Sequence, residues 1–244
     1  MYEWYYAGAY WEHRKESAWE CGRRAALLFD MLSRCDPTFA QWYRGGQGVL
    51  RGLPGHPVRA EANEWEALFL NGMRRSDANQ EVMEELGFQE SVWNARRERT
   101  RVEIHCGGYA PGVRNSCLLR PPEEGAVRER LLQAPILAEL LTCLATAWDP
   151  DFAIVSSSEM VERIQQRKWE VRVGWLTYLS RRLGVVPPLP APVRIEPVGA
   201  LGWLLILSPE RMSASNPEHV SFTARIRELL DRAHLLERAG RPQG

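Results

Sequence analysis

The sequence predicts an α+β fold, in which a mostly antiparallel sheet is covered by packed helices. Runs with strict apolar and polar alternation, typical of strands, occur beside runs with apolar residues at helical spacing. These two kinds of run do not alternate regularly as βαβ units, and neighbouring strand-like runs are spaced as hairpins, which favours antiparallel pairing. The 244 residues can bury one large core and show no internal repeat. We therefore expect a single domain over residues 1–244, with 121–122 as the only plausible seam.

The N-terminal segment is expected to form a strand followed by a long helix. Residues 2–11 are aromatic and β-prone, which predicts the strand. Ser17 and Glu20 have the spacing of a capping box, which predicts that a helix begins there. Asp36-Pro37 should end this helix. Its apolar face recurs at steps of three and four residues: Ala18, Cys21, Ala25, Leu28, Leu32 and Cys35.

The middle of the chain is expected to contain a loop, two short helices and a hairpin. Residues 44–60 are rich in glycine and proline, which predicts a loop. The first helix should contain Trp65 and end at Asn71-Gly72, and the second should run from Asp77 to Gly87. Residues 101–106 then alternate as a strand, and 113–119 is its expected partner.

The third quarter is expected to be helical and then extended. Residues 123–147 predict a helix with a break or restart at Pro135, because proline lacks the amide proton that the helix needs. Ser156 and Glu159 repeat the capping-box spacing and predict a short helix. Residues 169–175 alternate strictly and predict a strand.

The last quarter is expected to hold two strands and a final helix. The proline-rich segment 185–192 should be a connector, followed by strands at 193–198 and 201–207. Asn216 is the expected cap of the last helix, with Pro217 at its first position and Gly240 at its end. Its expected buried side comprises Phe222, Ile226, Leu229, Leu230 and Ala233.

Bulk composition indicates a cytoplasmic protein and identifies no partner. The 31 basic and 31 acidic residues cancel, so net charge points to neither nucleic acid nor a membrane. Five cysteines without a CxxC pair are typical of free thiols in a reducing compartment. The start of the chain lacks a secretory signal, and the longest apolar run, 199–207, is too short to cross a bilayer.

No pattern of strong catalytic specificity is present, so we expect no catalytic residue, metal or cofactor. His105, Cys106 and Cys117 could be imagined as metal ligands, but neighbouring strand residues point to opposite faces. A surface histidine and buried thiols are the simpler interpretation. Asp149 and Asp151 could supply paired carboxylates, but a helix stop around Pro150 is favoured.

Charge is unevenly distributed along the chain. Segment 61–90 contains eight acidic residues and two arginines, whereas segment 94–120 contains six arginines and two glutamates. One interpretation is that amphipathic helices expose solvated acidic faces near a basic hairpin. The other is that an acidic surface steers and holds a basic partner. The candidate partner-binding residues are Glu61, Glu64, Asp77, Glu81, Glu84 and Glu85.

Several motifs resemble the immunity protein 52 family, bacterial immunity proteins of polymorphic toxin systems often found beside type VI secretion genes. The resemblance begins in 8–17 with Gly8-Ala9-Tyr10-Trp11, Arg14 and Glu16-Ser17, and continues in the DPTFAQWY stretch at 36–43. Weaker matches are ELGFQESVWN (85–94), GWLTYLS (174–180) and NPEHV (216–220). Glu12 departs from the pattern, where we expect a glycine, which leaves the geometry of that turn open.

The resemblance implies a non-enzymatic protein that binds and neutralises a cognate toxin. The toxin implied by the family is a nuclease with a restriction-endonuclease fold, and nucleases need basic surfaces for phosphate backbones. An acidic inhibitor face would be complementary, without direct contact to nucleic acid. Tyr10 and Trp11 are expected in the core beneath the first helix. Arg14 could contact the toxin, but a structural role is favoured, in which it pairs with Glu16 or a helix end. The alternatives are a cytoplasmic adaptor or scaffold, and an enzyme with an unrecognised site.

Overall fold

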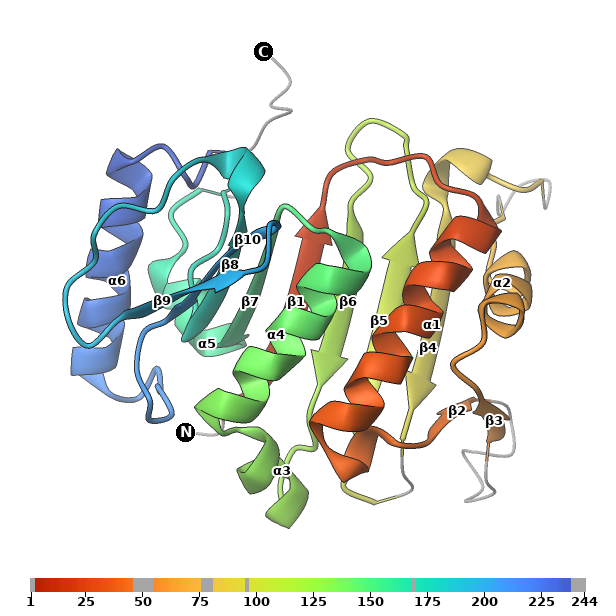
Figure 1. Cartoon of the computed structure of the whole chain (residues 1–244), viewed down its shortest axis with the longest axis horizontal. Coiled ribbons are helices and arrows are strands. Elements are labelled where there is room, and N and C mark those ends of the chain that lie inside the picture. Colours follow the sequence, from red (N-terminus) through yellow and green to blue (C-terminus); the bar gives the residue numbers. More distant parts are fainter. Residues whose placement is uncertain (1–2, 46–54, 76–80, 95–96, 168–169, 238–244) are drawn as a thin grey trace.

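The computed structural model describes residues 3–45, 55–75, 81–94, 97–167 and 170–237 (Figure 1). The described helices are α1 Ala18–Cys35, α2 Ala62–Asn71, α3 Ala126–Leu131, α4 Ala134–Trp148, α5 Ser158–Ile164 and α6 Pro217–Arg232. The described strands are β1 Tyr5–Trp11, β2 Trp42–Arg44, β3 His56–Val58, β4 Phe88–Trp93, β5 Arg101–Cys106, β6 Asn115–Arg120, β7 Phe152–Ser157, β8 Leu176–Ser180, β9 Arg194–Val198 and β10 Gly202–Ile206.

The ten strands of the described residues form one sheet in the order β3-β2-β4-β5-β6-β1-β7-β8-β10-β9. Every neighbouring pair is antiparallel, which confirms the expected α+β class and sheet type. The first strand of the chain lies in the interior of the sheet, between β6 and β7. The position predicted as a seam, 121–122, falls between β6 and α3.

Helices α1 and α4 cover one face of the sheet, and α2 lies beside α1 near the β4 edge (Figure 1). Aromatic stacking joins these layers: Trp11 stacks on Trp148 with ring centroids 5.1 Å apart, and Phe29 stacks on Trp65 at 4.5 Å. Gly22 allows α1 to approach α2 closely, because a Cβ there would lie 2.6 Å from the carbonyl oxygen of Ala62.

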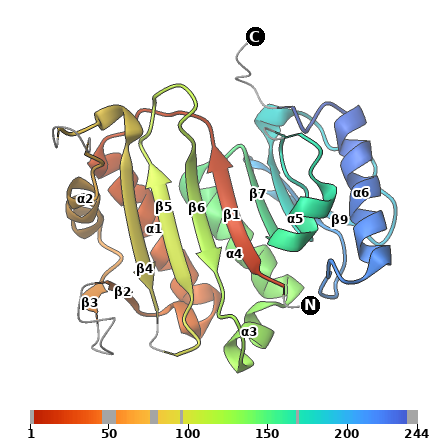
Figure 2. The same ribbon diagram turned by 180° about the vertical axis from the view of Figure 1, so that it is seen from behind.

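The opposite face is covered over only part of its width. Helices α5 and α6 lie toward this face on the side of β7 to β10 (Figure 2). None of the described helices lies over β4, β5, β6 and β1 on this side. We call this region the open sheet face. Alternate residues of those four strands point toward it, and of these Gln89, Arg101 and Arg120 are exposed.

Local start and stop signals are confirmed at the long helices. The Ser17 hydroxyl accepts a hydrogen bond from the Glu20 amide, and the Glu20 carboxylate accepts from the Ser17 amide, as a capping box requires. Helix α1 ends at Cys35, α4 restarts with Pro135 in its first turn, and α6 begins after the Asn216 cap.

Two predictions in the middle of the chain are wrong. The helix expected up to Gly87 is reduced to a single 3-10 turn at Glu84–Leu86, within the described residues from 81 onward. The reason is extended pairing with the segment before it: Arg75 forms a β-bridge with Val82, and the Met83 amide donates to the Arg74 carbonyl. The predicted loop at 44–60 also contributes short strand segments at its two ends, in β2 and β3.

Three further predictions in the second half are wrong in position. Residues 170–175 are irregular, and the strand follows at Leu176–Ser180; the buried Val171 and Val173 explain the misleading alternation. The cap of α5 is Ser157, the last residue of β7, instead of Ser156, and its hydroxyl accepts the Met160 amide. Helix α6 ends at Arg232, and Gly240 lies outside the described residues. On its buried side Ile226 and Leu230 are buried as expected, whereas the other predicted positions are half-buried.

Candidate partner-binding surfaces

The first group of predicted acidic residues lies at the start of α2. Glu61 precedes the helix and Glu64 is in its first turn, where the helix dipole favours negative charge. Both share one counterion, since Arg59 lies 3.2 Å from Glu61 and 3.0 Å from Glu64. The Arg59 amide also donates to the Glu64 carboxylate. This local pairing reduces the negative charge that the group presents to a partner.

The second group lies between α2 and β4. Glu81 and Glu84 are exposed and Glu85 is half-buried, with Glu84 and Glu85 on the same 3-10 turn. The Glu85 carbonyl accepts the amides of Tyr109 and Ala110, which fixes the turn against the β5–β6 connection. The predicted residue Asp77 lies outside the described residues.

Glu90 belongs to the same acidic segment but is not part of its surface. Its side chain is 9% exposed and faces the interior, with Arg44 at 3.0 Å. Burial raises the pKa of this carboxyl, although Arg44 acts in the opposite direction. The acidic surface is therefore smaller than the sequence count suggests.

Two arginines of the basic segment lie on the open sheet face. Arg101 of β5 and Arg120 of β6 are direct cross-strand neighbours, and both form ion pairs with Glu103. Near β1, the guanidinium of Arg172 lies 5.5 Å from the ring centroid of Tyr10. Sequence reasoning found the charge asymmetry but did not identify this face. The alternation of Arg101, Glu103 and His105 was the signal that these side chains share one face of the sheet.

A groove of about 870 Å³ lies at the end of the open sheet face, where β1 begins and β6 ends. Side chains that line it include Trp4, Tyr6, Arg97, Arg99, Arg101 and Arg120. The indole of Trp4 is 49% exposed, which is unusual for so large an apolar group. We call this feature the arginine groove.

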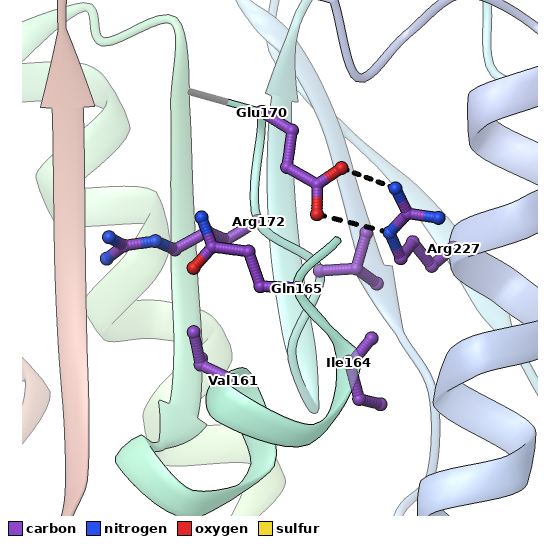
Figure 3. Close-up of a pocket in the computed structure, with 7 residues that line it drawn as sticks. Val161, Ile164, Gln165, Glu170, Arg172 and Arg227 are labelled. Atoms are coloured by element: carbon purple, nitrogen blue, oxygen red, sulfur yellow. Dashed lines mark hydrogen bonds and ion pairs between the residues drawn. The ribbon is translucent and has the colours of Figure 1, made fainter. Parts of the chain in front are cut away.

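A second hollow, beside α5 and α6, is too small for a substrate. Its volume is about 10 Å³, room for about one water molecule. Figure 3 shows Glu170 and Arg227 facing each other across it, joined by two contacts. The ion pair closes this hollow, so it is a structural feature of the core.

The described residues contain no group of three or more metal-ligating side chains. His105 lies on the outer face beside Arg74, whereas Cys106 is buried on the inner face with Cys117, as the strand alternation predicts. Burial raises the pKa of Cys117, which keeps its thiol protonated.

The carboxylates of Asp149 and Asp151 both pair with Arg182, at 2.8 and 3.5 Å. The Asp149 amide also donates to the Ala145 carbonyl at the end of α4. These contacts confirm the helix stop.

Among the described helices, none combines the length and apolar character that crossing a membrane requires.

The arginine of the N-terminal motif holds the end of α4. The guanidinium of Arg14 donates to the carbonyls of Trp148 and Asp149, and it pairs with Glu16 at 3.0 Å. Arg24 pairs with the other oxygen of Glu16 and donates to another carbonyl of α4. Cations at a helix C-terminus are favourable because the last carbonyls lack amide partners. Both contacts that were expected for Arg14 are therefore present.

Comparison with known proteins decides the family. The sequence model of a family described as Immunity protein 52 matches residues 3–239. The chain belongs to the immunity protein 52 family. Four solved chains match its fold, among them "Pseudomonas aeruginosa T6SS protein PA0821", with a TM-score of 0.51 and 12% identity. That match covers 93% of this chain and 73% of the other, and at this identity it shows the fold alone. No curated protein matches the chain.

In this member of the immunity protein 52 family, the N-terminal motif serves the fold. Trp11 is buried under α4, but Tyr10 points to the opposite side of the sheet and stacks on Phe152, since strand neighbours alternate. The expectation that Tyr10 lies beneath the first helix is therefore wrong. Gly8 leaves room for that ring, because a Cβ there would lie 2.8 Å from the Tyr10 hydroxyl oxygen.

Glu12, the departure from the family pattern, occupies a turn that does not need glycine. Positive φ among described residues other than glycine occurs only at Glu98, Asp149 and His234. The Glu12 amide donates to Asp151, and its carbonyl accepts from Asn115. The side chains of Asp151 and Asn115 thus hold the turn through the Glu12 backbone.

Proposed function

We propose that this chain is an immunity protein that binds a cognate toxin and neutralises it by covering part of the toxin surface, without catalysis. Membership of the immunity protein 52 family is the observation that carries this proposal. The proposed toxin is a nuclease with a restriction-endonuclease fold, delivered by a type VI-like secretion system. The proposed place of action is the cytoplasm, in keeping with five cysteines that are all free thiols.

Glu81, Glu84 and Glu85 form the core of the proposed toxin contact. A nuclease binds phosphates through a basic surface, so an acidic inhibitor face is complementary to it. Glu84 is exposed on the short turn, and Glu81 is exposed just before it. Glu61 and Glu64 are proposed to contribute less, because each already shares Arg59. Asp77 completes the proposed set.

The test is co-expression with the toxin gene adjacent to the gene of this chain, scored by survival of the host and by co-purification. The variant Glu81→Lys/Glu84→Lys/Glu85→Lys should slow association and weaken protection, because three attractive charges become repulsive. A matched control, Glu162→Lys/Glu210→Lys/Glu228→Lys, makes the same charge change at exposed sites on the other half of the molecule. This control should protect like the parent protein.

Two results would contradict the proposal at different levels. A folded triple variant that associates at the parental rate would remove the acidic contact but leave the immunity function. Failure of the parent protein to bind or protect against the neighbouring toxin would remove the function itself. An interface of standard size, about 1,600 Å² in total, is sufficient for specific inhibition.

A further inference from the structure

The arginine groove combines a concave shape with a cluster of exposed arginines. Its volume of about 870 Å³ is within the range of ligand-binding clefts, roughly 300–1,000 Å³. Four arginines with exposed side chains line it: Arg97, Arg99, Arg101 and Arg120. The exposed Trp4 provides an apolar wall beside them. Arginine and tryptophan are enriched among the few residues that supply most of the binding energy at protein interfaces.

The placement of Arg101 directly opposite Arg120 is unfavourable for the isolated protein. Directly opposite residues of antiparallel strands have Cβ atoms about 5 Å apart, and like charges at this distance destabilise the pair. One carboxylate, Glu103, serves both guanidinium groups. The two arginine side chains remain 51% and 48% exposed. An additional carboxylate from a ligand would relieve this repulsion.

Glu98, which lies between Arg97 and Arg99 in the sequence, binds elsewhere. Glu98 directs its carboxylate to the start of α3, where it accepts the Val127 amide at 2.7 Å. Its charge therefore serves the N-terminus of that helix. Glu123 and Glu124, on the linker between β6 and α3, line the groove as well. The groove is thus basic along β5 and β6 and acidic along the linker.

We propose that the arginine groove binds a carboxylate-bearing segment of a protein partner. Arg101 and Arg120 receive the carboxylates, since the guanidinium fork matches carboxylate geometry with two parallel hydrogen bonds. Trp4 contacts an apolar side chain of the same segment. A nucleic acid fits less well, because its regularly spaced phosphates would also meet Glu123 and Glu124. This proposal rests on the proposed function for the identity of the partner, which is the toxin. The arginine groove would contact the toxin at a second place, separate from Glu81, Glu84 and Glu85.

The test uses a fluorescein-labelled peptide of one tryptophan, two glutamates and four serines. Two adjacent carboxylates can reach Arg101 and Arg120 without a row of negative charge that extends to Glu123 and Glu124. Binding to the full chain is followed by anisotropy at low salt. The variant Arg101→Gln/Arg120→Gln should weaken binding by about tenfold or more, because two charge-assisted contacts are lost. The control Arg225→Gln/Arg232→Gln removes the same charge from exposed positions on α6. This control should change the affinity by less than about twofold.

Three results would overturn the proposal: no binding of the peptide by the parent protein, an equal loss in both variants, or tighter binding of an oligothymidylate than of the peptide. Thermal denaturation of each variant checks that the fold is retained. The peptide assay does not involve the toxin, so its failure would leave the proposed immunity function untouched. Failure of the parent protein to protect cells, with peptide binding intact, would instead contradict the proposed function alone.

Discussion

Replacing Arg227 by methionine should strongly destabilise the protein, because it leaves a buried carboxylate without its main counterion. The side chains of Glu170 and Arg227 are only 2% and 4% exposed. Two contacts join them, one of them between Nε of Arg227 and Oε1 of Glu170 at 3.2 Å (Figure 3). This pair holds α6 against the segment that leads into β8.

The magnitude follows from the partners that remain. Removing one member of a buried ion pair typically costs about 3–5 kcal/mol. Glu170 would keep the Gln166 amide at 2.8 Å and the guanidinium of Arg167 at 3.4 Å. We therefore expect Arg227→Met to lose about 3 kcal/mol, at the lower end of that range. The double variant Glu170→Leu/Arg227→Met should lose less, because no buried charge is left unpaired.

Urea unfolding of the parent, both single variants and the double variant gives the coupling energy between the two side chains. Burial raises the pKa of Glu170, but the hydrogen bonds from Arg227 and the Gln166 amide outweigh burial and lower it overall. The folded state therefore loses stability as the pH falls through this pKa, and the deficit of Arg227→Met should shrink in acid. A loss below about 1 kcal/mol at neutral pH, or a double variant as unstable as the sum of the single variants, would refute this reasoning.

Three further predictions concern other parts of the structure. Hydrogen bonds from residues 213–215 outweigh burial and hold the pKa of Glu3 at about 2, against an ordinary value of 4.5. Glu3→Gln should therefore lower the free energy of unfolding by about 1–3 kcal/mol at pH 7, and this loss should disappear as the pH falls from 4.5 to about 2. Urea unfolding at each pH measures the loss, and a loss independent of pH would contradict the prediction. Arg14→Met should cost about 1–3 kcal/mol, because the end of α4 loses its cationic cap, and an unchanged melting temperature would contradict it. Cys35 is half-exposed, and its hydrogen bond with Cys143 lowers its pKa, so it should be the first cysteine that iodoacetamide alkylates. Mass spectrometry measures the rate of alkylation, and a Cys35→Ser variant that is alkylated as fast as the parent protein would refute this.

Local signals predicted the elements whose ends depend on nearby residues. The caps at Ser17 and Asn216 and the restart at Pro135 act within one helical turn, so the sequence contains all that is needed. Residues 81–87 behave differently because their backbone pairs with Arg74 and Arg75. Such pairing depends on the path of the chain between them, which periodicity does not contain.

Strands buried on both faces were also beyond prediction from alternation. Every residue of β7 is buried, so its sequence, FAIVSS, shows no polar alternation. In β4 the pattern is disguised by Glu90, a carboxylate that faces the interior beside Arg44. Alternation of apolar and polar residue types therefore identifies neither strand. In β7 both faces are covered, and in β4 a charged side chain points to the buried face.

The arginine groove illustrates the same limit at the level of a surface. The sequence shows an excess of arginine over 94–120. It does not show that Arg101 lies opposite Arg120, or that Trp4, from a distant part of the sequence, lines the same groove. The register of β5 on β6 and the position of β1 supply that information.

The interior position of β1 governs the order in which the chain can fold during synthesis. Residues 5–11 leave the ribosome early, but their partners at 115–120 and 152–157 follow more than a hundred residues later. Until then β1 lacks its neighbours β6 and β7, and pairing with them requires long-range contacts that form slowly. Nascent chains that end before β7 should therefore depend on chaperones, because β7 completes the pairing that joins β1 to the strands on its other side.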